Sequence, residues 1–214
     1  MTVTGAAWVC LVSAAVVALA DWVAVVRGQK TLEYACKPLT IVLLMAVAAT
    51  VHVDDGSVRG WFLAALTLSM LGDVWLMLPR DLFIPGLASF FLAHVAFIAG
   101  MWVDGVSFLG FTLGLTVAVI AAIVVGGRVL RAVKGGEDPA MAVPVGAYMG
   151  VISLMLASAV GTEEPLAIGG AALFFCSDAL IAWERFVRPQ PWHRLAINVT
   201  YHLAQAGLAL SLVT

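Results

Sequence analysis

The sequence predicts an all-α polytopic membrane protein with eight transmembrane helices and both termini on the extracytoplasmic side. Of the 214 residues, 63% are hydrophobic and only 11% are charged, and the apolar residues form long runs separated by short connections. A soluble domain carries about 25% charged residues. The 11 Lys and Arg and 13 Asp and Glu of this chain cannot cover such a surface. Composition therefore excludes soluble enzymes, nucleic-acid binders and disordered proteins.

Each apolar run is long enough to cross a bilayer. Backbone polar groups in lipid must be satisfied within their own segment, so apolar runs of roughly 17–25 residues indicate helices. The predicted spans cover residues 5–26, 37–53, 61–79, 85–103, 106–126, 141–160, 165–187 and 194–213. No connection has room for a soluble domain, so we expect residues 1–214 to form a single transmembrane domain with its function inside the bundle.

The basic residues predict the orientation of the bundle. Cytoplasmic loops of membrane proteins are enriched in Lys and Arg. Ten of the 11 basic residues lie on the side of the connections that follow the first, third, fifth and seventh spans, and only Arg59 lies on the other. These connections are expected to face the cytoplasm from the cell (inner) membrane. Ala18-Leu19-Ala20 resembles a signal-peptide cleavage site, but no Lys or Arg precedes it, so we expect the first span to be retained.

Three aspartates lie within the predicted spans, where a charge costs about 2.5–3.5 kcal/mol and marks a functional site by default. Asp73 and Asp178 each precede the basic residue at the cytoplasmic end of their span, Arg80 and Arg185, by seven residues. At a rise of about 1.5 Å per residue, both lie roughly 10 Å inside the same membrane face. We predict that these two carboxylates share one cavity. Asp21 is closer to its span end and is expected to have a structural role.

Polar residues on other spans are expected to join this cavity in the cytoplasmic half of the membrane. The last span has a polar stripe at helical spacing, formed by Asn198, Tyr201, His202 and Gln205. Earlier spans contribute Lys37, His94 and Tyr148. Structural roles are the alternatives for these three: snorkelling for the lysine, interhelical hydrogen bonding for the histidine, and an aromatic belt for the tyrosine.

A faint internal repeat supports the pairing of the two aspartates. The third and seventh spans both read small-Asp-x-x-[Leu/Ile]-x-x-x-Arg, and the spans that follow them carry His94 and His202. The pattern is consistent with a weak repeat of two four-span halves. The three cysteines share no CxxC or CxxH spacing and are expected to be free thiols rather than zinc ligands or disulfide partners.

The chain resembles the YhhN-like integral membrane family, whose characterised members are lysoplasmalogenases. The resemblance extends over spans two to eight. It rests on Lys37-Pro38-Leu39-Thr40, Leu71-Gly72-Asp73, Phe91-Leu92-Ala93-His94, Gly170-Ala171-Ala172-Leu173-Phe174-Phe175-Cys176-Ser177-Asp178 and Tyr201-His202-Leu203-Ala204-Gln205. The chain departs from the family at His202, where many relatives are expected to have a second tyrosine.

The resemblance implies hydrolysis of the vinyl-ether bond of a lysoplasmalogen, with a lysophospholipid as substrate and no metal or other cofactor. This chemistry needs a carboxylic acid that keeps its proton near neutral pH and an anion beside it, and two unequal carboxylates provide both. Asp73 and Asp178 are the expected catalytic pair. The expected substrate-binding residues are Lys37, His94, Tyr148, Tyr201, His202 and Gln205, with the lysine holding the lipid phosphate together with Arg80 or Arg185.

Other functions are compatible with the same residues. A metal-dependent intramembrane lipid hydrolase would use two His and two Asp as ligands, but only His94 and His202 lie within spans. A proton-coupled transporter would use the acidic residues as a relay, but broken helix pairs are missing. An intramembrane aspartyl protease would carry Gly-x-Gly-Asp, which is absent, and a purely structural protein is the remaining alternative. The sequence does not indicate the lipid headgroup, the chain length or the oligomeric state.

Overall fold

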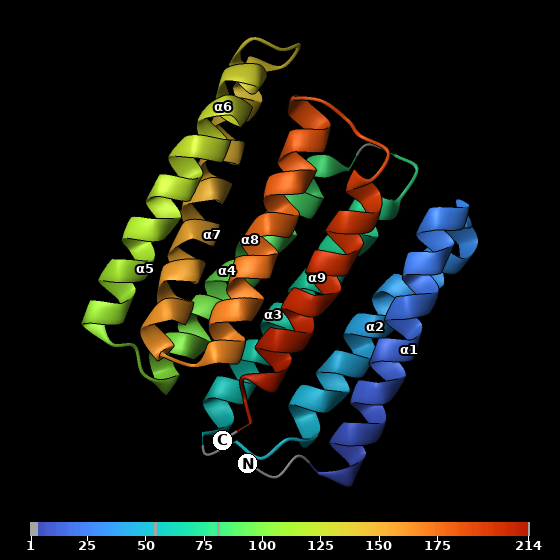
Figure 1. Cartoon of the computed structure of the whole chain (residues 1–214), viewed down its shortest axis with the longest axis vertical. Coiled ribbons are helices and arrows are strands. Elements are labelled where there is room, and N and C mark those ends of the chain that lie inside the picture. Colours follow the sequence, from blue (N-terminus) through green and yellow to red (C-terminus); the bar gives the residue numbers. More distant parts are fainter. Residues whose placement is uncertain (1–3, 54, 81, 214) are drawn as a thin grey trace.

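The computed structural model describes residues 4–53, 55–80 and 82–213, and all of its regular structure in these ranges is helical (Figure 1). The long helices are α1 (Gly5–Arg27), α2 (Lys30–Thr50), α3 (Gly56–Met77), α4 (Phe83–Asp104), α5 (Phe108–Ala121), α7 (Ala142–Thr162), α8 (Pro165–Phe186) and α9 (His193–Leu210). Helix α5 continues through the π-helical turn η1 (Ala122–Gly126) into α6 (Gly127–Lys134), and the 3-10 turn η2 (Pro139–Met141) precedes α7.

Seven helices of the described chain are long and apolar enough to cross a membrane, with α5, η1 and α6 counting as one and η2 extending α7. The all-α polytopic membrane fold is therefore confirmed. Helix α9 has 18 residues but is not among the seven. It carries the predicted polar stripe, which lowers its apolar character, so the eighth crossing stays a prediction.

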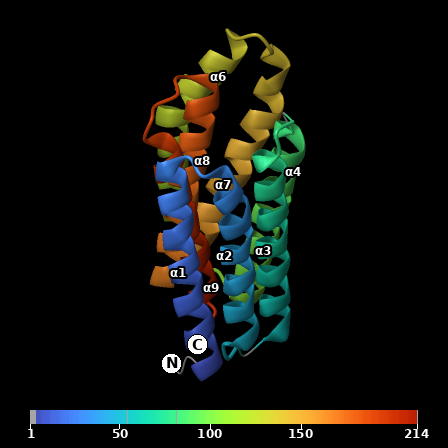
Figure 2. The same cartoon turned by 90° about the vertical axis from the view of Figure 1, so that its right-hand side faces the viewer.

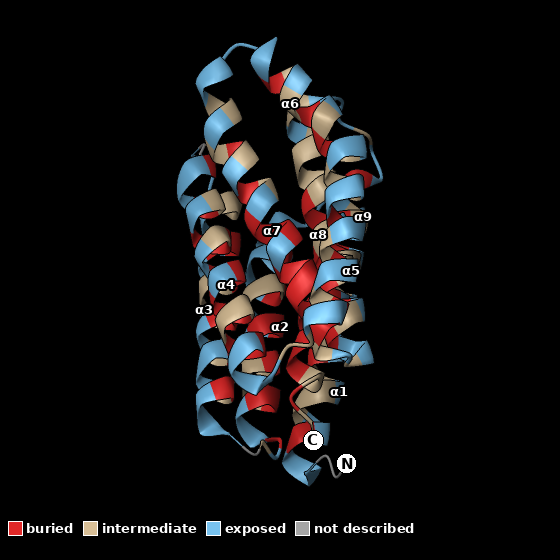
Figure 3. Cartoon of the chain, turned by 90° about the vertical axis from the view of Figure 1, so that its left-hand side faces the viewer, coloured by how far each residue is buried: buried red, intermediate tan, exposed pale blue. Residues whose placement is uncertain are grey.

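The helices pack as hairpins around a central α9 (Figures 1 and 2). Helix α9 contacts α8, α2, α1 and α3, whereas α5 lies at the outer edge and packs mainly on α7. The buried residues line the faces that look into the bundle, and the exposed residues look outward (Figure 3). The start of α1 and the end of α9 lie at the same end of the bundle (Figure 1). The central position of α9 explains how a helix with a polar stripe can be buried.

Local sequence signals define several helix ends. Thr4 accepts a hydrogen bond from the Ala7 amide at the start of α1, and Ser107 accepts one from the amide of Gly110 at the start of α5. Both are standard N-cap residues, which satisfy amides that have no partner inside the helix. Gly28 ends α1 in the left-handed region, at φ 68°. This conformation costs glycine little and allows the tight connection to α2.

Helices α8 and α9 approach each other closely at a pair of glycines. A Cβ atom added to Gly170 would lie 2.9 Å from the backbone oxygen of Ala204, and one added to Gly207 would lie 3.1 Å from the Cα of Gly170. Small residues let helices pack backbone to backbone within a membrane. This contact fixes the helix that carries Asp178 against the helix that carries Tyr201.

The predicted start of the second span, residue 37, is wrong. Helix α2 begins at Lys30 and contains Pro38 in its interior. The charges of its first turns suggested a loop, but two of them are neutralised inside the fold. Glu33 forms an ion pair with Arg194 at 2.7 Å, and Lys37 forms one with Asp73. The helix therefore extends further than its hydropathy alone predicts.

The predicted end of the fifth span, residue 126, is also wrong. The helix continues through η1 and α6 to Lys134. Val129 and Val133 of this extension are buried against Val145 of α7, while the Arg131 side chain is hydrogen-bonded to its own helix backbone and is exposed. An amphipathic extension thus continues beyond the apolar run. The other predicted spans overlap the observed helices, with smaller differences at their ends.

Candidate active site

Asp73 of α3 and Lys37 of α2 form a buried ion pair. The Lys37 Nζ lies 2.9 Å from Asp73 Oδ1, and the two side chains are 12% and 2% exposed. The lysine ammonium also lies 5.2 Å from the centre of the Tyr201 ring, in a cation–π arrangement. Its nearest charge is therefore a carboxylate within the bundle. The ion pair allows Asp73 to be buried as an anion, since a buried charge is tolerated when it is paired.

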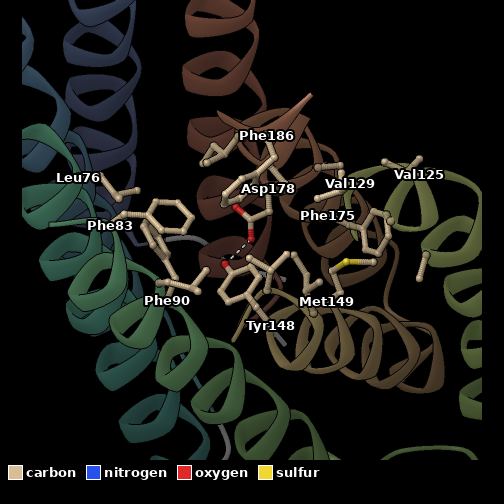
Figure 4. A pocket seen from close by; sticks show the side chains of 18 residues that line it. Leu76, Phe83, Phe90, Val125, Val129, Tyr148, Met149, Phe175, Asp178 and Phe186 are labelled. Atoms are coloured by element: carbon tan, nitrogen blue, oxygen red, sulfur yellow. Dashed lines mark hydrogen bonds between the residues drawn. The ribbon is translucent and has the colours of Figure 1, made fainter. Parts of the chain in front are cut away.

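Asp178 of α8 has different partners, Tyr148 of α7 and His94 of α4. The Tyr148 hydroxyl donates a hydrogen bond of 2.5 Å to Asp178 Oδ2 (Figure 4). His94 Nε2 lies 3.5 Å from the same oxygen. His94 Nδ1 lies 2.6 Å from the Phe90 carbonyl oxygen, which only accepts, so this nitrogen carries a hydrogen. If the ring is neutral, Nε2 carries a lone pair that faces the Asp178 carboxyl group. The nitrogen and the carboxyl oxygen then attract each other only when a proton lies between them.

The two carboxyl groups belong to one cluster. Asp73 and Asp178 interact electrostatically, and Tyr201 interacts with both. The Phe174 ring lies between the two halves, with its centre 4.7 Å from that of His94 and 5.5 Å from that of Tyr201. Helices α3 and α8 thus place the two aspartates within electrostatic range of each other, but Asp178 and not Asp73 lines the apolar pocket described below, so a cavity shared by both stays a prediction. Their catalytic role stays a prediction.

The polar stripe of α9 is buried but divides between two surroundings. Tyr201 and Gln205 are 2% and 0% exposed and lie on the Asp73 side, where the tyrosine hydroxyl interacts with Asp73 and Gln205 without a well-formed hydrogen bond. His202 is also buried, but its Nδ1 accepts a hydrogen bond of 3.1 Å from the Trp22 indole of α1. The structure therefore brings four of the six predicted binding residues to the carboxyl groups, places Gln205 beside Tyr201, and turns His202 toward α1.

Asp21 of α1 was not predicted to belong to the site. It has no exposed surface and interacts electrostatically with Lys37 and Asp73. Neither of its oxygens has a hydrogen-bond partner in the described part of the chain. The sequence did indicate a similar membrane depth for Asp21, because it precedes the basic residue Arg27 by six residues. Asp73 and Asp178 precede their basic residues by seven. The interactions of Asp21 with Lys37 and Asp73 depend on the packing of α1 against α2, which no local sequence pattern predicts.

Many buried polar atoms around this cluster have no partner among the described residues. They include atoms of Asp21, Ser69, Asp73, His94, Asn198, Tyr201, His202 and Gln205. Buried polar groups are almost always hydrogen-bonded to protein or ordered water. A concentration of unsatisfied groups in one region is what a polar substrate and its attacking water would complete.

An apolar pocket adjoins the Asp178 half of the cluster (Figure 4). Its lining comes from α3, α4, α7, α8 and the continuous helix of α5, η1 and α6. Asp178 and Tyr148 are the residues of this lining that carry side-chain oxygens. The pocket therefore places hydrocarbon beside a carboxyl group, as an amphiphilic ligand requires.

The described residues contain no group of three or more His, Cys, Asp and Glu side chains that could hold a metal ion. His94 and His202 bond to a backbone carbonyl and to an indole, respectively. All three cysteines are unpaired, as predicted; Cys36 is buried, whereas Cys176 is exposed.

The fold and site together define an integral membrane protein with a buried cluster of acidic and basic side chains beside an apolar pocket. A sequence model of the YhhN family matches residues 32–212, and the chain belongs to this family. The chain is 34% identical over 171 residues to lysoplasmalogenase TMEM86B of Homo sapiens, covering 79% of this chain and 71% of the relative. It is 30% identical over 190 residues to a lysoplasmalogenase of Mycobacterium tuberculosis, covering 86% and 70%. No solved structure matches the chain.

Proposed function

We propose that the protein is a lysoplasmalogenase, which hydrolyses the vinyl-ether bond of a lysoplasmalogen to a fatty aldehyde and a glycerophospho-base. The observation that carries the proposal is the cluster of Asp73 and Asp178, one paired with a cation and the other with a hydroxyl group and an imidazole. The names of the relatives point to the same reaction.

Vinyl-ether hydrolysis needs a proton donor, an anion and a water molecule. A proton adds to the alkenyl carbon that is not bonded to oxygen, and the adjacent carbon becomes an oxocarbenium ion. Water adds to that carbon and gives up a proton, forming a hemiacetal. The hemiacetal breaks its bond to the glycerol oxygen and yields an aldehyde and an alcohol. Two carboxyl groups in unequal surroundings are suited to the donor and anion roles.

Asp178 is assigned as the proton donor, with His94 and Tyr148 as its partners. The Phe90 carbonyl accepts the hydrogen of His94 Nδ1, so Nε2 of the neutral ring would be free to exchange a proton with Asp178. The Tyr148 hydroxyl donates to the same carboxyl oxygen and fixes its direction. Asp178 also lines the apolar pocket, where an alkenyl carbon would be placed.

Asp73 is assigned as the anion that stabilises the oxocarbenium ion and takes the proton of water. Lys37 at 2.9 Å compensates its charge in the unliganded site. Tyr201 and Gln205, whose polar atoms have no well-formed partners, would orient the water and the ether oxygen. Lys37 would also attract the lipid phosphate, and His202 would position Tyr201 through its bond to Trp22.

The proposal includes eight crossings, with both termini outside and the site in the cytoplasmic half of the cell membrane. Its support is the central place of α9, which is surrounded by α1, α2, α3 and α8, so its polar residues need not face lipid. The asymmetry of the basic residues gives the same orientation.

Substrate comparison tests the function directly. Purified protein is given a lysoplasmalogen, its ester-linked analogue and its saturated-ether analogue, all with the same chain and headgroup, and aldehyde and fatty acid are measured. We expect aldehyde from the vinyl ether and no product from the other two. Fatty acid from the ester, or no aldehyde from the vinyl ether, would overturn the proposal. Loss of activity in a chelator and its recovery with zinc would favour the metal-dependent alternative.

A further inference from the structure

The lining of the apolar pocket carries side-chain oxygens at Asp178 and Tyr148 alone, and apolar side chains extend from these two residues in two directions. Toward α3 and α4 its lining includes Leu76 and Phe90. Leu76 lies on the helix of Asp73, and the Phe90 ring lies 5.9 Å from that of Tyr201. In the opposite direction, Met149 and Phe175 lead to Val125 of the π-helical turn (Figure 4). On the α3 and α4 side, the apolar lining is thus backed by Tyr201 of the polar cluster, whereas the side toward η1 is lined by hydrocarbon alone.

The π-helical turn η1 forms the far wall of this pocket. Ala122, Val125 and Gly126 of the turn all line it. The intervening Ile123 and Val124 are 68% and 54% exposed on the outer face, so the turn separates the pocket from the surrounding lipid. Single π-helical turns widen a helix locally and are frequent at functional sites. The turn here coincides with the pocket wall.

Gly126 and Met149 control the width of the pocket at this wall. A Cβ atom added to Gly126 would lie 1.5 Å from the Cε of Met149, so the methionine fills the space that the missing side chain leaves. Both residues line the pocket. Any side chain at position 126 must push the flexible Met149 side chain aside.

We propose that this pocket binds the single alkenyl chain of the substrate, with the vinyl-ether end at Asp178 and Tyr148 and the tail directed to η1. Gly126 and Met149 then determine which chain lengths are accepted. This inference rests on the proposed function and adds to it the location of the chain and the residues that select its length.

A second cavity is the alternative binding site for the alkenyl chain. It lies between α1, α2 and α9 and is lined by residues that include Leu11, Leu44, Trp22 and His202. Neither catalytic aspartate lines it. A chain bound there would place its vinyl-ether end beside the Trp22–His202 hydrogen bond rather than beside the assigned proton donor.

Photo-crosslinking distinguishes the two cavities without depending on turnover. The probe is a saturated-ether lysolipid with a diazirine at the end of its chain, bound to the purified full-length protein and mapped by peptide mass spectrometry. We expect labels within residues 122–129 and 145–152, reduced by excess unlabelled saturated-ether lysolipid. Competed labels confined to residues 11–22 and 203–206 would overturn the inference.

Chain-length selectivity tests the roles of Gly126 and Met149. In Gly126→Ala, kcat/KM for a long-chain lysoplasmalogen should fall at least about tenfold relative to a short-chain one, since one methylene in an apolar pocket is worth about 10–200-fold. Adding Met149→Ala should restore the ratio. Gly127→Ala is the matched control, because a Cβ there meets nothing within 4 Å.

An unchanged chain-length ratio in folded Gly126→Ala would contradict the inference. If that variant does not fold, Met149→Ala alone decides the question, because it should shift the preference toward longer or bulkier chains. The failures of the two proposals are distinct. No aldehyde from any chain length would defeat the proposed function, whereas the crosslinking map would still locate the chain.

Discussion

Asp73 and Asp178 are the same residue type in the same cluster, yet their neighbours differ in charge. An ammonium group lies 2.9 Å from Asp73, whereas the closest groups to Asp178 are a tyrosine hydroxyl and a histidine nitrogen. A cation beside a carboxyl group favours its ionised form. The proposed roles, Asp73 as the anion and Asp178 as the acid, rest on these neighbours.

Tyr148→Phe tests the donor half of the site. The change removes the hydroxyl that donates to Asp178 at 2.5 Å and leaves the ring in place. Asp178 becomes a carboxylate as it gives up its proton, and a hydrogen bond to a charged group is worth about 1.5–3 kcal/mol, so we expect kcat to fall roughly 10- to 100-fold with little change in KM. Aldehyde-release kinetics measure both. Tyr34→Phe, at an exposed position on α2, is the control, and an unchanged kcat in Tyr148→Phe would contradict the assignment.

The ion pair of Lys37 and Asp73 predicts strong coupling between two substitutions. Lys37→Met leaves a buried carboxylate without its cation and should lower the free energy of unfolding by about 3–5 kcal/mol. Adding Asp73→Asn should recover most of this stability but no activity. Unfolding curves in detergent for the wild type, both single variants and the double variant complete the cycle. Additive losses would show that the pair does not stabilise the fold.

At the scale of single residues, the free-energy cost of placing a charged side chain in lipid was the signal that pointed to the candidate site. It identified Asp73 and Asp178 because a charge within an apolar span needs a reason. It did not reveal the partners of Asp21 or the bond from Trp22 to His202. Those contacts join α1 to α2, α3 and α9 across long stretches of chain, and no local pattern encodes them.

At the scale of elements, hydropathy located every long helix but misplaced the ends where charges are neutralised or turned outward. Glu33 and Lys37 lowered the apolar signal of α2, although both are paired in the fold. The π-helical turn η1 gave no signal at all, because its residues, Ala122–Gly126, continue the apolar run of α5. Its position depends on the packing of α5 and α6 on α7.

The close contact of α8 and α9 predicts opposite effects at neighbouring glycines. A Cβ at Gly170 would lie 2.9 Å from the Ala204 oxygen, whereas one at Gly169 meets nothing within 4 Å. Gly170→Ala should cost about 1–3 kcal/mol through overpacking, and Gly169→Ala should be neutral or stabilise by up to about 1 kcal/mol. Thermal unfolding in detergent measures both. Equal midpoints for the two variants would contradict the tight helix contact.

At the scale of the whole molecule, the bundle places its polar residues inward and its most apolar helix outward. Helix α9 lies at the centre with its stripe buried, and α5 lies at the edge with Phe108 and Leu109 exposed at 83% and 68%. This is the arrangement that lipid requires, since the hydrocarbon faces apolar side chains and the polar cluster is shielded. If the eight proposed crossings alternate in direction, the acidic cluster lies in the cytoplasmic half, as proposed above.

Cysteine labelling tests that orientation. Single cysteines are introduced as Ser57→Cys and Glu137→Cys, both at exposed positions, in a protein whose three native cysteines are replaced by alanine. A membrane-impermeant maleimide applied to intact spheroplasts should label position 57 and should reach position 137 only after lysis. The reverse pattern would invert the topology and place the acidic cluster in the extracytoplasmic half.

The central claim is that two carboxyl groups, one from α3 and one from α8, act together on one vinyl-ether bond. Aldehyde release from a lysoplasmalogen by Asp73→Asn and Asp178→Asn measures it most directly, with folding checked by thermal unfolding. Each folded variant should lose at least about two orders of magnitude in kcat, because a general acid or base contributes about 10²–10⁴-fold. Turnover close to that of the wild type in either folded variant would contradict the account.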